Sequence, residues 1–393
     1  MIGNNKWTNG LVPAVLMYIG LGLIYCWSMI KGDIAYAMSC SGTEIEIAFS
    51  LSLFCLGITA VISGKLVDYN EKLSSGISTA LYGIGMGGSI YAISHGLPLL
   101  FIVMYGVVQG VALGIGYLTP IRTLIIWFDK RKGLALGLAL MAFAGSKIIF
   151  APIIHELLKV WSVTYVMGLL ATVCLVFMSI ATFLINAPRD IIHENVTLED
   201  IKKNVFNREY ISIWGMFLFN VACGVAMISY EKSMLLETGF SRVTLAITLV
   251  AVCNMLGRLL MPVLTQNTPN KANAYIYMFF SCILVTVIAL IDLNPISLIL
   301  LLCVANFCYG GSFSCLPVLL HERFGYKNIS LLHGLLLSAW AIGGFCGDMF
   351  ANFLFELLGS GGHVELIRKF FIFYMIAFII TFTNLCSSKK ISI

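Results

Sequence analysis

Three ionisable residues stand inside long apolar stretches of the sequence, where water is scarce. They are Lys147, Arg258 and Asp348. A charge at the centre of a bilayer costs about 2.5–3.5 kcal/mol on insertion scales, so such residues usually face a water-filled cavity or a charged partner. Two cations against one acid give this region a positive potential when all three are ionised, and a positive potential favours an anionic ligand.

Arg258 is the strongest candidate for a contact with that ligand. A guanidinium stays charged at every relevant pH, and its planar fork of N–H groups matches the two oxygens of a carboxylate. The alternative is a structural arginine at the end of its helix, where it would cap carbonyl groups.

Lys147 and Asp348 each leave two alternatives open. Lys147 is either a second anchor for a carboxylate or the partner of Asp348 or another acid in an ion pair between helices. Asp348 either binds a coupling proton in one conformation, because solvation and nearby cations change the proton affinity of a carboxylate, or forms a fixed ion pair. Glu46 and Glu231 stand near the expected ends of their apolar stretches, and we expect them to be solvated.

Aromatic residues with a polar edge accompany these charges. Tyr25, Tyr117, Tyr309 and Trp340 lie in four different apolar stretches. A small anion between such rings would lose water, and its attraction to an arginine would then strengthen. Each ring alone is more often a packing residue than a ligand.

The elements that must position these residues follow from composition. Of 393 residues, 59% are hydrophobic and only 11% are charged, against roughly 25% charged in soluble domains. Because a membrane span needs ~20 apolar residues, the sequence predicts an all-α integral membrane protein with twelve transmembrane helices, at residues 8–30, 43–64, 76–95, 98–121, 133–158, 162–186, 210–230, 243–264, 272–292, 296–320, 331–357 and 367–386.

The long polar interval falls midway along the chain. It predicts an N-terminal six-helix half at 1–186, a cytoplasmic linker at 187–210 and a C-terminal six-helix half at 211–393, the pattern of a duplicated transporter. Most lysine and arginine residues of the loops fall on the side that holds both termini. By the positive-inside rule, we expect the N- and C-termini to be cytoplasmic.

The turn after the second span carries a recognisable motif. Gly64-Lys65-Leu66-Val67-Asp68-Tyr69-Asn70-Glu71-Lys72 resembles the loop signature of the major facilitator superfamily, although Tyr69 replaces a basic residue and Glu71 a glycine. The resemblance implies two six-helix pseudo-repeats and a gating role for Gly64, Lys65, Asp68 and Lys72. In that role Gly64 permits a close helix approach, and Asp68 meets a helix N-terminus or a basic residue.

Further segments resemble the oxalate/formate antiporter-like, monocarboxylate-related branch of that superfamily. They cover most of the chain, at Tyr25–Ser28, Gly116–Pro120, Trp127–Gly137, Asn254–Arg258 and Tyr309–Pro317. The resemblance implies transport of small organic carboxylates by exchange or proton coupling. It also implies that the arginine of the eighth span, here Arg258, holds the carboxylate, and that the spans carrying the aromatic residues above line the cavity.

One departure from that branch bears on the cargo. Its oxalate-exchanging members carry a lysine in the eleventh span, and Trp340 stands at the corresponding place here. A dianion would therefore lose the partner of its second carboxylate, and only Lys147 remains to replace it. The sequence thus favours a monocarboxylate such as pyruvate, lactate or formate.

Other classes of function find little support. The sequence has no phosphate-binding loop, metal-ligand spacing or nucleophile motif, so we expect neither an enzyme nor a cofactor, and no nucleic-acid partner. The expected partners are a small organic anion, protons and the lipid bilayer of a plasma or organelle membrane, with the protein monomeric. Two alternatives stay open: a facilitator for a sugar or a cation, and a transporter-like metabolite sensor, suggested because Gln266 replaces the acid in the second copy of the loop motif.

Overall fold

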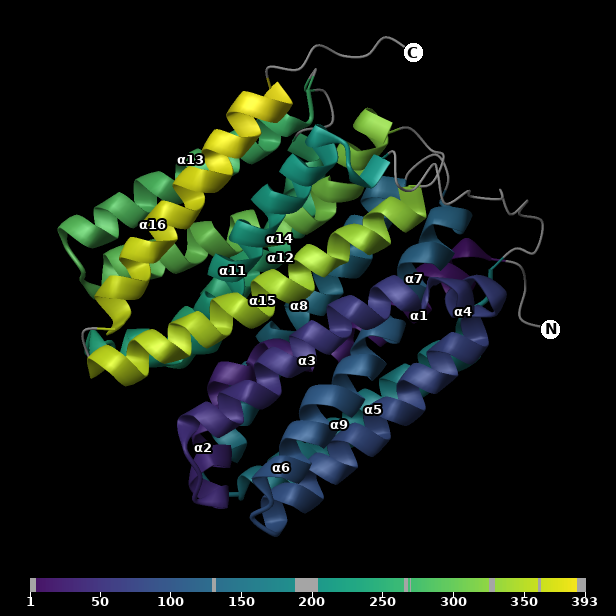
Figure 1. Ribbon diagram of the computed structural model, residues 1–393. Helices are drawn as coiled ribbons and strands as arrows, with labels where there is room; N and C mark the ends of the chain where they lie inside the picture. The colour runs from purple at the N-terminus through teal and green to yellow at the C-terminus, as the bar shows by residue number, and fades with distance from the viewer. Residues whose placement is uncertain are drawn as a thin grey trace.

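Long helices make up nearly all of the chain that the computed structural model describes, which is residues 5–128, 132–187, 204–264, 268, 270–324, 329–359 and 362–386. A helix satisfies its own backbone N–H and C=O groups, as the interior of a bilayer requires. We call residues 5–187 the N-terminal block and residues 204–386 the C-terminal block. Figure 1 shows the first in purple to teal and the second in teal-green to yellow, on opposite sides of the molecule.

The helices of the N-terminal block are, in chain order, η1 (Trp7–Leu11), α1 (Val12–Leu21), η2 (Gly22–Cys26), α2 (Trp27–Met38), α3 (Gly42–Ile62), α4 (Gly64–Tyr69), α5 (Glu71–Ser94), α6 (Pro98–Phe101), η3 (Ile102–Val108), α7 (Gln109–Trp127), α8 (Lys132–Leu157) and α9 (Val163–Leu184). Those of the C-terminal block are α11 (Arg208–Glu237), α12 (Val243–Leu264), α13 (Ala272–Ile291), α14 (Pro295–Phe324), α15 (Ile329–Leu358), α16 (Gly362–Ile380) and η6 (Thr381–Cys386).

The predicted apolar stretches agree with these helices in place and order. Within the described residues, eleven helical segments are long and apolar enough to cross a membrane. α5, in the place of the third predicted span, is a helix of 24 residues, about 36 Å at 1.5 Å per residue, but it is richer in serine and glycine than the eleven. Of the predicted linker, residues 188–203 lie outside the described residues, and α11 begins within it at Arg208.

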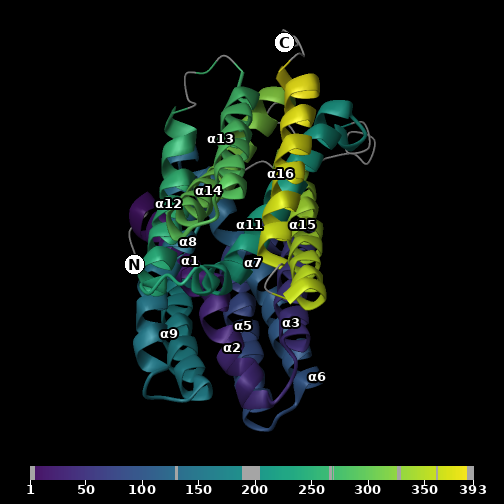
Figure 2. The ribbon, with the colours of Figure 1, turned by 90° about the vertical axis from the view of Figure 1, so that its left-hand side faces the viewer.

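The two blocks meet mainly through three pairs of helices, and α8 also contacts α14. α3 packs along α15, α8 packs along α12, and α2 contacts α11. In Figure 1, α3 and α15 run side by side through the middle of the molecule, and Figure 2 shows α2, α5 and α9 below the level of α13 and α16. Most residues that connect the blocks therefore lie on these helices or on the segments adjoining them.

The first membrane-spanning segment is interrupted at its centre. Between α1 and α2 the backbone tightens into η2, a 3₁₀ helix that contains Tyr25. Stretches of 3₁₀ helix in the middle of a longer helix often mark a functional hinge, and discontinuous helices commonly form the binding sites of transporters. The interruption places Tyr25 at the contact between the blocks.

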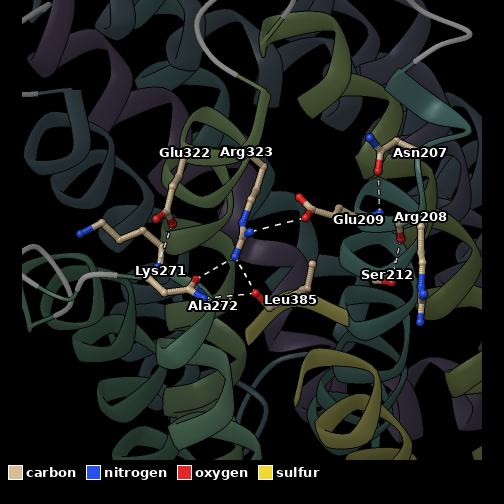
Figure 3. A network of polar contacts seen from close by, with 10 residues as sticks. Asn207, Arg208, Glu209, Ser212, Lys271, Ala272, Glu322, Arg323 and Leu385 are labelled. Atoms are coloured by element: carbon tan, nitrogen blue, oxygen red, sulfur yellow. Dashed lines mark hydrogen bonds and ion pairs between the residues drawn. The ribbon is translucent and has the colours of Figure 1, made fainter. Parts of the chain in front are cut away.

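A polar network joins four helix ends of the C-terminal block (Figure 3). Arg323, near the end of α14, lies 3.6 Å from a carboxylate oxygen of Glu209 and donates to the backbone oxygen of Leu385 at 2.6 Å and to Asn270 Oδ1 at 2.9 Å. Glu322, beside it, accepts from the backbone N–H of Lys271 at 2.8 Å. The network therefore ties α14 to the starts of α11 and α13 and to η6.

Removing the centre of this network should destabilise the block. The Arg323 side chain is 7% exposed, and hydrogen bonds to charged groups contribute about 1.5–3 kcal/mol each. We expect Arg323→Ala to lower the melting temperature of the purified protein in detergent by several degrees. The matched control is Arg368→Ala, because the Arg368 side chain is 64% exposed in its pair with Glu365. Equal melting temperatures for the two variants would contradict a stabilising role for the network.

Candidate functional site

Arg258 lies at the centre of a polar and aromatic cluster between the blocks. It is 1% exposed on α12. Its Nη2 donates to the hydroxyl of Tyr25 at 3.0 Å, across the contact between the blocks, and its Nε donates to Oδ1 of Asn254 at 3.1 Å, one helical turn earlier. Asn254 in turn donates to Oδ1 of Asn306 at 3.2 Å.

Aromatic rings surround the guanidinium of Arg258. Its central carbon lies 5.2 Å from the ring centroid of Phe313, 5.8 Å from that of Phe143 and 5.9 Å from that of Tyr25. At such distances a cation is attracted to the face of a ring, more strongly when water is excluded. The rings therefore provide partial compensation for the buried charge, without a negative group.

Two glycines allow this arrangement. A Cβ at Gly257 would overlap the backbone carbonyl of Phe307, so its absence lets α12 approach α14 closely. A Cβ at Gly224 would overlap the ring of Tyr309, so its absence leaves room for that ring beside α11. Tyr309 then reaches Tyr25, with 3.5 Å between the two hydroxyl oxygens.

The other two predicted aromatic residues form a second layer of rings. Tyr117 and Trp340 are both buried, and their rings pack edge to face with centroids 5.1 Å apart. Tyr117 also contacts Phe143 at 5.8 Å, and Trp340 contacts Phe313 at 4.9 Å. Because Phe143 and Phe313 flank Arg258, this layer supports the rings around the guanidinium.

Lys147 on α8 forms an ion pair with Glu231 on α11, and the pair therefore connects the two blocks. The same carboxylate oxygen of Glu231 accepts a hydrogen bond from Ser28 at 3.2 Å. Of the two alternatives for Lys147, the structure contains the ion pair, with Glu231 rather than Asp348 as the acid. The expectation that Glu231 is solvated is wrong, because α11 continues to Glu237, past the predicted end of that span, and buries Glu231 completely.

Asp348 on α15 is fully buried and accepts a hydrogen bond from Ser50 on α3. Its second oxygen, Oδ1, has no hydrogen-bond partner among the described residues. The fixed ion pair considered for Asp348 is not present, since no described cation lies within ion-pair distance of it.

Glu46 stands one turn before Ser50 on α3 and pairs with Lys31 at 3.1 Å. It also accepts from the indole N–H of Trp27 at 3.1 Å. Glu46 is buried, so the expectation that it is solvated is also wrong. Residues four apart share one face of a helix, so Glu46 and Asp348 belong to the same contact between α3 and the C-terminal block.

A small cavity lies beside these residues. Its lining is Tyr25, Ala144, Lys147, Ile228, Val250, Ala251, Asn254 and Asn306. Lys147 borders the cavity directly, whereas Arg258 reaches its wall through its hydrogen-bond partners Tyr25 and Asn254. The predicted residues of α8, α12 and η2 are thus gathered around one space.

The buried charges can now be counted. Among the Asp, Glu, Lys and Arg residues of the described chain, the almost fully buried ones are Glu46, Lys147, Glu231, Arg258 and Asp348. The predicted count of two cations against one acid was wrong, because it omitted Glu46 and Glu231. Once the two ion pairs are set aside, Arg258 and Asp348 remain, each without an oppositely charged partner in the described chain.

The predicted gating residues lie apart from this cluster, between α3 and α5. A Cβ at Gly64 would meet open space, so the close helix approach expected there is absent from this conformation. Lys72, at the start of α5, is exposed. The side chains of Lys65 and Asp68 lie outside the described residues, and the gating role stays a prediction.

Several residues of the cluster escaped the sequence analysis. Asn254 had a usable signal, since it stands four residues before Arg258 in the segment already singled out. Phe313 had one too, since it stands within the segment Tyr309–Pro317, whereas Phe143 and Asn306 had none, because the apolar stretches contain many similar residues. No group of three or more His, Cys, Asp or Glu residues suited to a metal ion occurs in the described chain.

Comparison with known proteins agrees with this architecture. Among solved structures, a D-xylose-proton symporter superposes with a TM-score of 0.69 over 96% of this chain and 98% of its own, at 15% sequence identity. At that identity the likeness shows the fold alone.

Curated relatives share low sequence identity over much of the chain. An uncharacterized MFS-type transporter of Escherichia coli (strain K12), YhjX, is 24% identical over 86% of this chain and 85% of its own length. The oxalate:formate antiporter of Oxalobacter formigenes is 21% identical over 87% of this chain and 83% of its own length. Apicoplast pyruvate carrier 1 of Toxoplasma gondii is 24% identical over 38% of this chain and 34% of its own length.

The family model of the Major Facilitator Superfamily matches residues 14–348. This match covers most of both blocks and includes every residue of the cluster around Arg258. It confirms the resemblance to that superfamily, and it confirms the expectation of an integral, multi-pass membrane transporter rather than an enzyme. The chain is a member of the major facilitator superfamily.

Proposed function

We propose that this protein is a secondary active transporter of small monocarboxylates, of the class of pyruvate, lactate or formate, that works by alternating access. The observation that carries the proposal is Arg258, a buried guanidinium without a carboxylate partner in the described chain. A buried charge is costly unless it is paired. A bound carboxylate would supply the missing partner, and the fork of Arg258 suits its two oxygens.

The surroundings of Arg258 support an anion that is small and flat. Phe143 and Phe313 flank the guanidinium, and Tyr25 and Tyr309 offer hydroxyl groups beside it. Rings of this kind would displace water from a planar anion and so strengthen its attraction to Arg258. The names of the relatives, an oxalate:formate antiporter and a pyruvate carrier, are consistent with this class of cargo.

Asp348 is the proposed site of proton coupling. It is a buried carboxyl without a cationic partner in the described chain, and it bridges α15 and α3 between the blocks. When the cargo anion neutralises Arg258 and a proton neutralises Asp348, both unpaired charges are compensated at once. This count of charges suits electroneutral symport of one proton with one monocarboxylate. With the proton bound to Asp348 throughout, the same site would exchange one monocarboxylate for another.

The remaining features of the proposal concern topology, gating, oligomeric state and location. We propose that the six helical spans at 1–186 and the six at 211–393 are pseudo-repeats joined by the segment 187–210, and that both termini are cytoplasmic. Gating by Gly64, Lys65, Asp68 and Lys72, a monomeric state and residence in a plasma or organelle membrane belong to the same proposal.

A panel of competitors in proteoliposomes tests the function. We expect the proteoliposomes to take up labelled pyruvate, lactate or formate when the medium outside them is more acidic than their interior. An excess of other small monocarboxylates should suppress this uptake. Sugars and organic cations should not compete. Competition by a sugar or a cation, with none by carboxylates, would instead favour a facilitator for neutral or cationic solutes. Saturable binding without any accumulation would favour a sensor.

A further inference from the structure

The ion pair between Lys147 and Glu231 lies on the wall of the cavity beside Arg258. We propose that Glu231 determines how many carboxylates the cargo can carry. By neutralising Lys147, it leaves Arg258 as the single unpaired cation that the described chain places at the cavity, so that a monocarboxylate fits and a dicarboxylate is rejected. The inference rests on the proposed function, which it extends from a class of cargo to the residue that selects within the class.

The geometry places the two cations beside one space. Lys147 lines the cavity together with Tyr25 and Asn254, and those two residues are the hydrogen-bond partners of Arg258. Two free cations at one cavity would suit a small dicarboxylate, because each carboxylate could meet its own cation. Lys147 is the residue that could serve as the second cation, and its ion pair with Glu231 removes it from that role.

Glu231 competes directly with any second carboxylate of the cargo. Its Oε1 accepts from both Lys147 and Ser28, and it is 0% exposed. Two carboxylates held beside one ammonium group repel each other strongly when water is excluded. When one carboxylate of a dianion is bound to Arg258, Lys147 is already neutralised by Glu231. The second carboxylate of the dianion would therefore stay unpaired.

A purely structural role accounts less well for this pair. A buried ion pair stabilises a protein only when its remaining hydrogen-bonding capacity is satisfied. The second oxygen of Glu231, Oε2, has no hydrogen-bond partner among the described residues. Since Glu231 lies on α11 and Lys147 on α8, the pair also spans the contact between blocks that must change during alternating access.

The test compares the selectivity of three proteins in proteoliposomes. Uptake of a labelled monocarboxylate is inhibited with unlabelled oxalate or malonate and, separately, with an unlabelled monocarboxylate. In Glu231→Gln the freed Lys147 should improve inhibition by the dicarboxylates, relative to the monocarboxylate, at least tenfold. The matched control is the double variant Lys147→Gln/Glu231→Gln, which carries the same change at 231 without a freed cation and should keep the wild-type ratio.

Lys147→Gln tests the same balance of charges at the cavity by removing the cation of the ion pair instead of the acid. With its partner gone, Glu231 adds an unpaired negative charge to the cavity wall, so the affinity for the monocarboxylate should fall at least tenfold. The double variant should restore that affinity to within about threefold of wild type. This comparison between Lys147→Gln and the double variant does not use the single variant Glu231→Gln. It therefore tests the inference even if Glu231→Gln fails to fold.

Three results would overturn the inference while leaving the proposed function intact. They are an unchanged selectivity ratio in a folded Glu231→Gln, an equal shift of that ratio in the double variant, and a double variant that binds monocarboxylate as weakly as Lys147→Gln. The last would mean that Lys147 contacts the cargo itself. Failure of every carboxylate to inhibit wild-type transport would instead refute the proposed function.

Discussion

Replacing Arg258 by lysine is expected to lower carboxylate uptake by about a hundredfold while the protein still folds and inserts. Lysine keeps the positive charge but is a compact point charge, so it loses the fork and both hydrogen bonds that orient the guanidinium, to Tyr25 and Asn254. At about 1.36 kcal/mol per tenfold change, a hundredfold loss corresponds to about 2.7 kcal/mol, within reach of a bidentate charged contact made in a water-excluded site.

The measurement is the initial rate of labelled monocarboxylate uptake into proteoliposomes, normalised to the amount of reconstituted protein. Arg368→Lys on α16 is the matched control, because the chemical change is identical and the side chain is 64% exposed, far from the cluster in sequence. Wild-type uptake by Arg258→Lys would show that the guanidinium does not bind the cargo. An equal loss in both variants would point to a general effect of the substitution.

Much of the fold was accessible from the sequence for a simple physical reason. An apolar bilayer requires long apolar helices, so hydrophobic stretches locate them with little help from tertiary contacts. The two helices that differ from the prediction, α5 and α11, do so for physical reasons as well. α5 contains serine and glycine and is less apolar than the eleven segments of the described chain that qualify as spans. α11 extends to Glu237 and buries Glu231, which it can do because the carboxylate of Glu231 pairs with Lys147 on α8 of the other block.

The site was predictable only in part, because hydrophobic stretches reveal a charge in their middle but not a charge near their ends. Arg258, Lys147 and Asp348 were conspicuous because each is a charge among apolar residues. Glu231 and Glu46 were not, since they follow or precede apolar stretches and the position of a helix end decides whether they are buried. The sequence also cannot show which acid meets which cation. That Lys147 pairs with Glu231 depends on the packing of α8 against the C-terminal block, and this pairing changes the interpretation of Lys147 from a free anchor to a neutralised one.

Asp348→Asn is expected to abolish accumulation driven by a pH gradient while exchange of carboxylates continues. Asparagine resembles the protonated carboxyl in shape and is always neutral, so the variant should behave as though the coupling proton were permanently bound. The steady-state accumulation ratio should fall to about 1, whereas counterflow between two loaded compartments should stay within about threefold of the wild-type rate. Both quantities can be measured in the same proteoliposome preparation, with and without an imposed gradient.

The control for this variant distinguishes the binding of a proton by Asp348 from the hydrogen bond that Asp348 makes between the blocks. Ser50 donates its hydroxyl to Asp348 across α3 and α15, so Ser50→Ala removes the hydrogen bond but leaves the carboxyl free to bind and release a proton. We expect Ser50→Ala to retain accumulation, perturbed only in rate. Accumulation that survives in Asp348→Asn would contradict proton binding at this residue, and Glu46, one turn from Ser50 on α3, would be the next carboxyl to test. Loss of both accumulation and exchange in Asp348→Asn would mean that Asp348 acts as a structural contact between the blocks, because a neutral side chain that merely replaced the bound proton would leave exchange intact.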